Sequence, residues 1–110
     1  MSIIESIMRE EYDRSKRFCN ALNKKIASLP KGYLRKKIIR NNEYWYLQYR
    51  DGSRVISKYI RKEDLEKVKK DIALRNEHCL SLKEHMLAQR QIERALGKDF
   101  VNEWANKRVS

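Results

Sequence analysis

The sequence has few of the residues that break or cross-link a chain: one proline, three glycines and two cysteines in 110 residues. Cys19 and Cys79 lie in helix-like stretches among apolar neighbours, which indicates buried free thiols in a reducing compartment and argues against a disulfide framework. No apolar run approaches the roughly 18 residues that a membrane span needs, and no signal-peptide pattern is present. We therefore expect a soluble cytoplasmic protein without a membrane partner.

Motifs for catalysis and for bound cofactors are also missing. The sequence has no Gly-rich phosphate loop, no nucleophile elbow and no pair of catalytic carboxylates. His78, Cys79 and His85 are the candidate metal ligands, but two helical turns, about 10 Å, would separate the histidines, which is too far for one tetrahedral zinc. We expect no catalytic residue, no metal site and no cofactor, and we expect that the protein is not an enzyme.

Positive charge is plentiful and concentrated in the middle third of the chain. The formal net charge is +11, and residues 31–62 hold ten Lys/Arg against two acids, a net +8. The segments on either side carry only +2 and +1. A basic excess of this size favours nucleic acid or another acidic surface as the partner.

Hydrophobic periodicity predicts an α+β fold in a single domain of residues 1–110. Apolar residues recur at spacings of three and four over residues 1–30 and again over 63–96, which is typical of helices. At about 1.5 Å per residue, both helices are long enough to pack together as a helical hairpin. A homodimer through the long helices is the alternative way to cover their apolar seam.

The second long helix has polar residues on its apolar side. Three positions of its heptad-like seam are polar, namely Arg75, Gln89 and Glu93. Gly97 is placed to end this helix, and a short closing helix over 98–108 is expected to fold back on the pair. We expect the ring of Trp104 to plug the end of the core.

The middle third has the pattern of a three-stranded antiparallel meander over residues 33–60. Three segments rich in Tyr, Trp, Ile and Val are separated by two strong hairpin signals, Asn41-Asn42 and Asp51-Gly52. Because side chains alternate across a sheet, the central strand directs Trp45 to one face and Tyr46 to the other. The function depends on which face is buried.

The faces of this sheet follow from the registers of its hairpins. A two-residue turn at Asn41-Asn42 fixes the first register, but the second turn is ambiguous. A three-residue loop Arg50-Asp51-Gly52 directs Arg54 and Lys58 to the side of Tyr46, and a tight Asp-Gly turn reverses this. We choose the three-residue loop because it separates apolar from cationic side chains. The face packed on helices then holds Leu34, Ile38, Trp45, Leu47, Val55 and Tyr59. The open face holds Arg35, Lys37, Tyr44, Tyr46, Gln48, Arg54 and Lys58.

An open sheet with cations around aromatic rings is suited to binding nucleic acid. Lys and Arg can contact the phosphates of a duplex while central side chains meet base edges in a groove. The same surface can stack single-stranded bases. An ordinary solvated face is the alternative, but such a face mixes both signs of charge, and only Glu43 and Asp51 are acidic within residues 31–62. The candidate nucleic-acid-binding residues are Arg35, Lys37, Tyr44, Tyr46, Gln48, Arg50, Arg54 and Lys58.

The run YWYLQYRDGSRVISKYIRKEDLEKVKKDI resembles the three-stranded N-terminal domain by which tyrosine integrases of phages and conjugative elements bind arm-site DNA. The resemblance covers residues 33–75 and implies a sheet inserted into the major groove. It also implies DNA-facing and core residues: Tyr46, Gln48, Arg50, Arg54 and Lys58 face DNA, and Trp45 and Leu47 belong to the core. The chain has no recombinase catalytic domain, and its long flanking helices are not part of the integrase module.

A wider stretch, KGYLRKKIIRNNEYWYLQYRDGSRVISKYI, is similar to small uncharacterised bacterial proteins found near mobile or defence elements. Together these patterns predict a small basic nucleic-acid-binding protein, with duplex DNA favoured and a regulatory or mobile-element role. A second hypothesis is a protein-binding antitoxin or phage-type inhibitor that docks its basic surface on a nucleic-acid-binding enzyme complex. A structural coiled-coil adaptor is the third.

Overall fold

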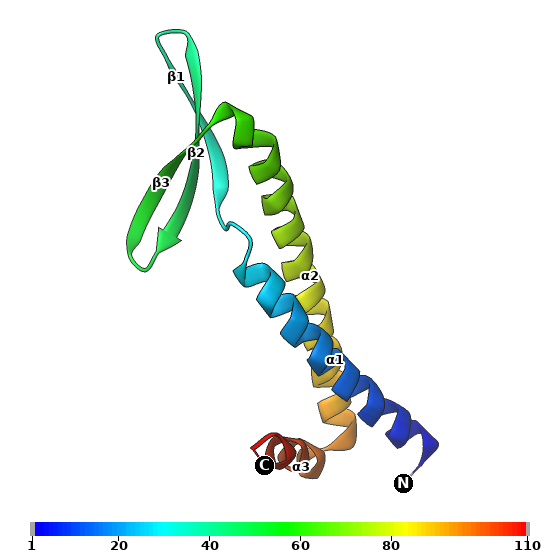
Figure 1. The fold of residues 1–110 in the computed structure, drawn as a ribbon. Coiled ribbons are helices and arrows are strands. Elements are labelled where there is room, and N and C mark those ends of the chain that lie inside the picture. Colours follow the sequence, from blue (N-terminus) through cyan, green and yellow to red (C-terminus); the bar gives the residue numbers. More distant parts are fainter. Residues whose placement is uncertain (1, 110) are drawn as a thin grey trace. The chain divides into compact units, whose positions relative to one another are not determined.

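The computed structural model describes residues 2–109 and the side chains of residues 2–106. The chain has the α+β fold that the sequence predicts (Figure 1). In chain order its elements are α1 (Ile3–Ala27), β1 (Tyr33–Ile39), β2 (Asn42–Asp51), β3 (Arg54–Ile60), the 3-10 helix η1 (Lys62–Asp64), α2 (Leu65–Leu96) and α3 (Lys98–Val109). Two compact units result: a helical unit, Met1–Lys24 with Cys79–Ser110, and a sheet unit, Lys25–His78. The single domain expected from the sequence stays a prediction.

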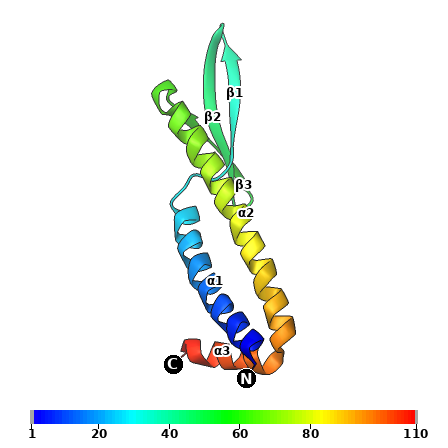
Figure 2. The ribbon, with the colours of Figure 1, turned by 90° about the vertical axis from the view of Figure 1, so that its right-hand side faces the viewer.

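The helical unit pairs α1 with the second part of α2 in antiparallel fashion (Figure 2). The Tyr12 hydroxyl donates to the Glu93 carboxylate at 2.7 Å, and buried Gln89 donates from Nε2 to Ser15 Oγ at 2.9 Å and to Cys19 Sγ at 3.3 Å. Burial, followed by the hydrogen bond to Glu93, raises the pKa of Tyr12. Two polar residues that interrupt the apolar seam therefore have partners on α1, which fixes how the helices align.

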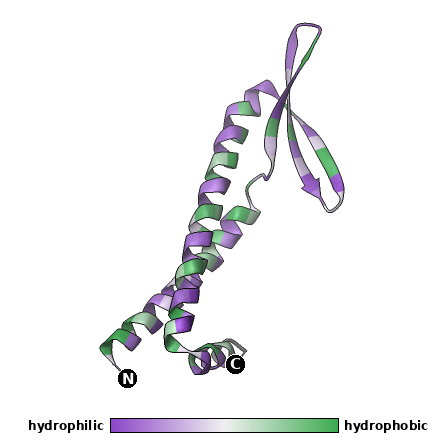
Figure 3. Cartoon of the chain, turned by 180° about the vertical axis from the view of Figure 1, so that it is seen from behind, coloured by the Kyte–Doolittle hydropathy of each residue, from purple (hydrophilic) through white to green (hydrophobic). Residues whose placement is uncertain are grey.

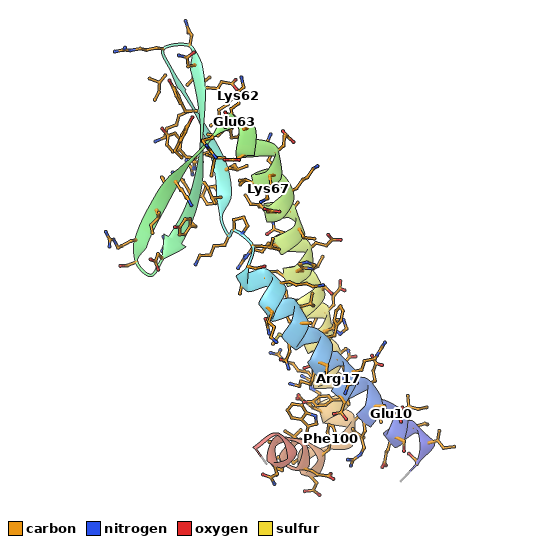
Figure 4. All side chains as sticks on the ribbon, in the orientation of Figure 1. Glu10, Arg17, Lys62, Glu63, Lys67 and Phe100 are labelled. Atoms are coloured by element: carbon orange, nitrogen blue, oxygen red, sulfur yellow. The ribbon has the colours of Figure 1, made fainter. Side chains whose placement is uncertain are left out.

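Helix α3 closes the end of the helical unit, as the sequence predicts. Gly97 ends α2 with a positive φ of 86°, which suits glycine, and α3 crosses the end of the helix pair (Figure 2). The buried ring at this end is Phe100, labelled in Figure 4, and its centroid lies 5.0 Å from that of Tyr12. Trp104 is only half-buried, and its Nε1 donates to Asp13 Oδ1 at 2.8 Å. The Trp104 ring also packs against Tyr12, with centroids 5.5 Å apart, so both rings close this end of the core and Phe100 is the more deeply buried of the two.

No helix in the described part of the chain combines the length and the apolar character that a membrane crossing requires. Hydrophilic and hydrophobic residues are interspersed along α1 and α2 (Figure 3).

The sheet unit contains the antiparallel meander in the order β1-β2-β3 (Figure 1). Its first turn consists of Arg40 and Asn41, whose φ angles of 51° and 67° are both positive, as in a type I′ turn. This turn begins one residue earlier than the sequence predicts, which shifts the pairing by two residues and leaves every side chain on its expected face. Leu34 lies opposite Leu47, as the expected faces require.

The second hairpin corrects the choice made from the sequence. Asp51 pairs with Arg54, so that Gly52 and Ser53 alone form the turn, and Gly52 has a φ of 64°. Glycine with positive φ at the first of two turn positions is the pattern of a type II′ turn, which matches the twist of the flanking strands. The three-residue loop was therefore wrong, and every β3 side chain lies on the face opposite to the one expected.

The packing explains why this register is preferred. It directs Ile56 and Ile60 to the side of Trp45, where Ile60 is 8% exposed and Ile56 is half-buried. Val55 and Tyr59, expected in the core, are 60% and 52% exposed on the other side. Two isoleucines thus lie on the packed face in place of a valine and a tyrosine, and Tyr59 stays half exposed.

One face of the sheet packs within the sheet unit and the other does not. Leu47, at the centre of β2, is 5% exposed, and Lys69 of α2 places its Nζ 5.1 Å from the centroid of the Trp45 ring. The segment before β1 also approaches β2, because a Cβ added at Gly32 would lie 2.2 Å from the backbone oxygen of Gln48. Lys62 and Glu63, labelled in Figure 4, mark the link from β3 to α2.

Candidate nucleic-acid interface

The strand pairing divides the side chains of the sheet into two sets. We call the side of Tyr46 the tyrosine face; its members are Tyr33, Arg35, Lys37, Ile39, Asn42, Tyr44, Tyr46, Gln48, Arg50, Val55, Ser57 and Tyr59. We call the opposite side the tryptophan face; its members are Leu34, Lys36, Ile38, Glu43, Trp45, Leu47, Tyr49, Asp51, Arg54, Ile56, Lys58 and Ile60.

Four of the six tyrosines of the chain lie on the tyrosine face. Tyr46 and Tyr59 lie directly opposite each other on β2 and β3, with ring centroids 5.8 Å apart and an angle of 65° between the rings. The ring centroids of Tyr44 and Tyr59 are 6.4 Å apart. Tyr33 stands at the other end of the face and is 53% exposed. The rings form a partly exposed aromatic surface that crosses all three strands.

The cations of the tyrosine face are Arg35, Lys37 and Arg50, and the face contains no acid. Lys37 Nζ lies 5.0 Å from the centroid of the Tyr46 ring, and Arg35 Cζ lies 5.3 Å from that of Tyr33, within the range of cation–π contacts. Among the ion pairs of the described residues, none includes any of these three cations. Their charges are therefore available to an anionic partner.

Gln48 is the amide side chain at the middle of this face. Its Nε2 donates to Ser57 Oγ on β3 at 3.0 Å, and the two residues are directly paired across the strands. This hydrogen bond holds the amide along the surface of the sheet, beside the rings. Part of its hydrogen-bonding capacity is thus already used within the protein.

Six of the expected binding residues lie on the tyrosine face: Arg35, Lys37, Tyr44, Tyr46, Gln48 and Arg50. Arg54 and Lys58 do not, because the tight second turn directs both to the tryptophan face. The expectation that Arg54 and Lys58 share a face with Tyr46 is therefore wrong. The expectation for the core fits better, since Leu47 is buried and Trp45 is half-buried.

The expected set missed two tyrosines. Tyr59 was assigned to the buried face by the wrong register of the second hairpin, so its position depends on that turn alone. Tyr33 precedes Arg35 by two residues on β1, and strand alternation alone would have placed it beside Arg35. Both rings are about half exposed and belong to the candidate interface.

The tryptophan face differs in its charge balance. It carries the cations Lys36, Arg54 and Lys58, but also both acids of the strands, Glu43 and Asp51. Lys36 Nζ lies 3.5 Å from Glu43 Oε1, so one cation already has a carboxylate partner. This face is nearly neutralised locally, and it contains the buried residues of the sheet.

The candidate metal ligands His78, Cys79 and His85 do not form a site. Nowhere in residues 2–109 do three or more His, Cys, Asp or Glu side chains come together in a way that could hold a metal ion. His85 Nδ1 instead lies 3.0 Å from Ser15 Oγ, at the seam of the helical unit. Both cysteines are free thiols, and Cys19 is buried.

A family model described as "Domain of unknown function (DUF6788)" matches residues 8–70, more than half of the chain. The chain belongs to this family. No curated protein and no solved structure matches it. The DUF6788 match contains all three strands, and with them the whole tyrosine face, together with most of α1 and the start of α2.

Proposed function

We propose that this DUF6788 protein binds nucleic acid through its tyrosine face. The observation that carries the proposal is the combination of three cations without carboxylate partners, four partly exposed tyrosines and no acid on one side of the sheet. Phosphates supply the missing counter-charges, and ring faces supply a surface for bases. A basic net charge of +11 attracts the same partner over longer distances.

The observed register of β3 weakens the argument for duplex DNA as the ligand. The expected duplex-binding face included Arg54 and Lys58 among the cations beside Tyr46, and these two cations lie on the other face. Two of the three cations that remain on the tyrosine face, Arg35 and Lys37, lie close to rings. Binding of nucleic acid in general keeps its support, whereas insertion into a duplex groove loses part of it. We place the protein in the cytoplasm, where free thiols such as Cys19 and Cys79 persist.

A matched pair of lysine variants tests the proposal. Retention of labelled duplex DNA, single-stranded DNA and single-stranded RNA by the full chain is measured at low salt and then across a salt series. Lys37→Gln, on the tyrosine face, is expected to weaken binding and to reduce the salt slope by about 0.7 to 0.9. Lys58→Gln removes the same charge from the tryptophan face and is expected to change binding less. If no nucleic acid is retained at low salt, the proposal fails.

A second candidate function is the protein-binding module, an antitoxin or inhibitor. It is favoured by the start of α1, where Ile3, Ile4 and Ile7 are 81%, 69% and 59% exposed. Apolar side chains exposed together are more typical of a protein contact than of a nucleic-acid contact. Capture of one stoichiometric protein partner that is lost in an Ile4→Ser, Ile7→Ser variant, without binding to any nucleic acid, would favour this candidate over the first.

A further inference from the structure

We infer that the tyrosine face binds single-stranded nucleic acid by stacking its bases, and this inference rests on the proposed function. The ligand class is an unpaired DNA or RNA strand, of which about two or three bases contact the rings at one time. A three-stranded sheet with strands about 4.8 Å apart is wide enough for such a contact. Tyr46, Tyr59 and Tyr44 form the centre of this platform.

The rings are arranged for contact with flat groups. The rings of Tyr46 and Tyr59 meet edge-on across β2 and β3, with centroids 5.8 Å apart, and Tyr44 lies diagonally beside Tyr59 at 6.4 Å. Tyr59 is nevertheless 52% exposed. A half-exposed ring in an aromatic cluster offers both apolar area and a π-surface to a base. The bases of a duplex are already stacked on each other and do not offer their faces, whereas an unpaired strand does.

At the centre of the tyrosine face, the side chains that could read base edges are engaged within the protein. Readout in the major groove relies on Arg, Lys, Asn or Gln side chains that reach toward the base pairs. The central amide, Gln48, donates to Ser57 instead, and Lys37 and Arg35 lie over Tyr46 and Tyr33. Without projecting donors at its centre, the face is better suited to stacking that tolerates many sequences.

The cations stand where the backbone of a stacked strand would need them. Arg35 and Lys37 occupy β1 along one side of the Tyr46 ring, and Arg50 lies further along β2. None has a carboxylate partner within the described residues, and no acid of this face would repel a phosphate. Three phosphate contacts predict a log-log salt slope of about −2 for a single strand.

The test uses the full chain and fluorescent oligonucleotides of about 12 units, within the usual range of site sizes. The probes are oligo-dT, oligo-rU and a mixed-sequence DNA duplex of the same length, and the readout is anisotropy. A single strand with one 2-aminopurine reports stacking directly, because its emission falls when the base stacks on a ring. Tyr59→Ser removes a ring and Tyr59→Phe keeps it; Tyr33→Ser repeats the ring loss at an exposed position of β1.

We expect the single strands to bind at least about tenfold more tightly than the duplex and to lose 2-aminopurine emission on binding. Tyr59→Ser should weaken binding about 5- to 100-fold, and Tyr59→Phe should stay within about twofold of the parent chain. The difference between oligo-dT and oligo-rU identifies DNA or RNA as the source of the strand. Duplex binding that equals strand binding and is unaffected by either serine variant overturns this inference and leaves the proposed function standing. Failure of every probe to bind at low salt overturns the proposed function itself.

Discussion

The tyrosine face and the tryptophan face each carry three cationic side chains, but only one of them is set up to receive an anion. On the tryptophan face the acids Glu43 and Asp51 accompany the cations, and Lys36 is already paired with Glu43. On the tyrosine face no acid accompanies the cations, and two of them, Lys37 and Arg35, lie over the rings of Tyr46 and Tyr33. The number of cations is equal, so the difference lies in their partners.

The comparison shows how strand parity sorts charge. Glu43 and Asp51 have odd residue numbers on β2, as Trp45 and Leu47 do, and alternation directs all four to the same side. The acids therefore share the side that also holds the buried residues of the sheet, and the other side is left without negative charge. A basic stretch in a sequence thus becomes a basic surface only when its acids fall on the opposite face.

The largest expected loss of stability comes from a substitution at Gly32, where the segment before β1 lies close to the backbone of β2. Gly32→Ala would place a Cβ 2.2 Å from the Gln48 backbone oxygen at a φ of 115°, where a side chain is also strained. We expect a loss of about 3 kcal/mol or more in the stability of the sheet unit, and both faces should be lost together. Hydrogen exchange of the β2 amides measures this opening.

Gly52→Ala is the matched control, because nothing lies within 4 Å of a Cβ at Gly52, although its φ of 64° disfavours alanine. Its cost should be about 1 kcal/mol. An equal loss at both glycines would contradict the close approach of Gly32 to β2.

The next largest effect is a difference in stability cost between truncations on the buried face and on the open face. Leu47→Ala on the tryptophan face should lower the free energy of unfolding of the sheet unit by about 2 to 3 kcal/mol, because the side chain is 5% exposed. Val55→Ala, also a shortened aliphatic side chain but 60% exposed on the tyrosine face, should change it by less than about 1 kcal/mol. Chemical denaturation followed by hydrogen exchange of the strands compares the two. Equal costs would mean that both faces are covered.

Adding an acid to the tyrosine face should remove the charge difference between the faces. Ser57→Glu places a carboxylate beside Gln48, on the side that now has none, and should weaken nucleic-acid binding about tenfold. Ser53→Glu makes the same change of charge in the second turn, outside both faces, and should weaken binding less. Anisotropy titrations at one salt concentration measure both. If the two glutamates act alike, total charge and not its placement governs binding.

Sequence patterns were enough for the helices and for the first hairpin. Helical periodicity survives small errors in the ends of an element, and the turn at Arg40 could be misplaced by one residue without moving any side chain to the wrong face. The hydrogen bond from Tyr12 to Glu93 could not be predicted from the sequence. A glutamate at an apolar seam position shows only that the apolar pattern is interrupted, and it does not show which residue would donate a hydrogen bond to it. The burial of Phe100 beside Trp104 was likewise not predicted, because the sequence does not show that both rings contact Tyr12.

The second hairpin shows the limit of such patterns for the candidate site. Asp51-Gly52 fits either the three-residue loop Arg50-Asp51-Gly52 or a tight two-residue turn, and the two alternatives exchange the faces of β3. The structure has a two-residue turn, formed by Gly52 and Ser53. The choice was made by sorting residue types, and it favoured collecting cations on the open side. Residues on β1 and β2 therefore lie on the predicted faces, although Ile38, expected to pack on the helices, is 65% exposed. Every β3 residue, Lys58 and Tyr59 included, lies on the face opposite to the predicted one.

The smallest expected change in stability concerns the first hairpin, whose turn determines which side chains of β1 lie on each face. Arg40 has a φ of 51°, a conformation that asparagine and glycine adopt far more readily than arginine. Arg40→Asn should therefore stabilise the sheet unit by about 0.5 to 1 kcal/mol, measured by chemical denaturation. Arg50→Asn makes the same substitution inside β2, where asparagine is disfavoured, and should not stabilise. Because Arg40 belongs to neither face, its loss should also leave most of the binding in place, and a loss as large as that of Lys37→Gln would mean that the turn itself contacts the nucleic acid.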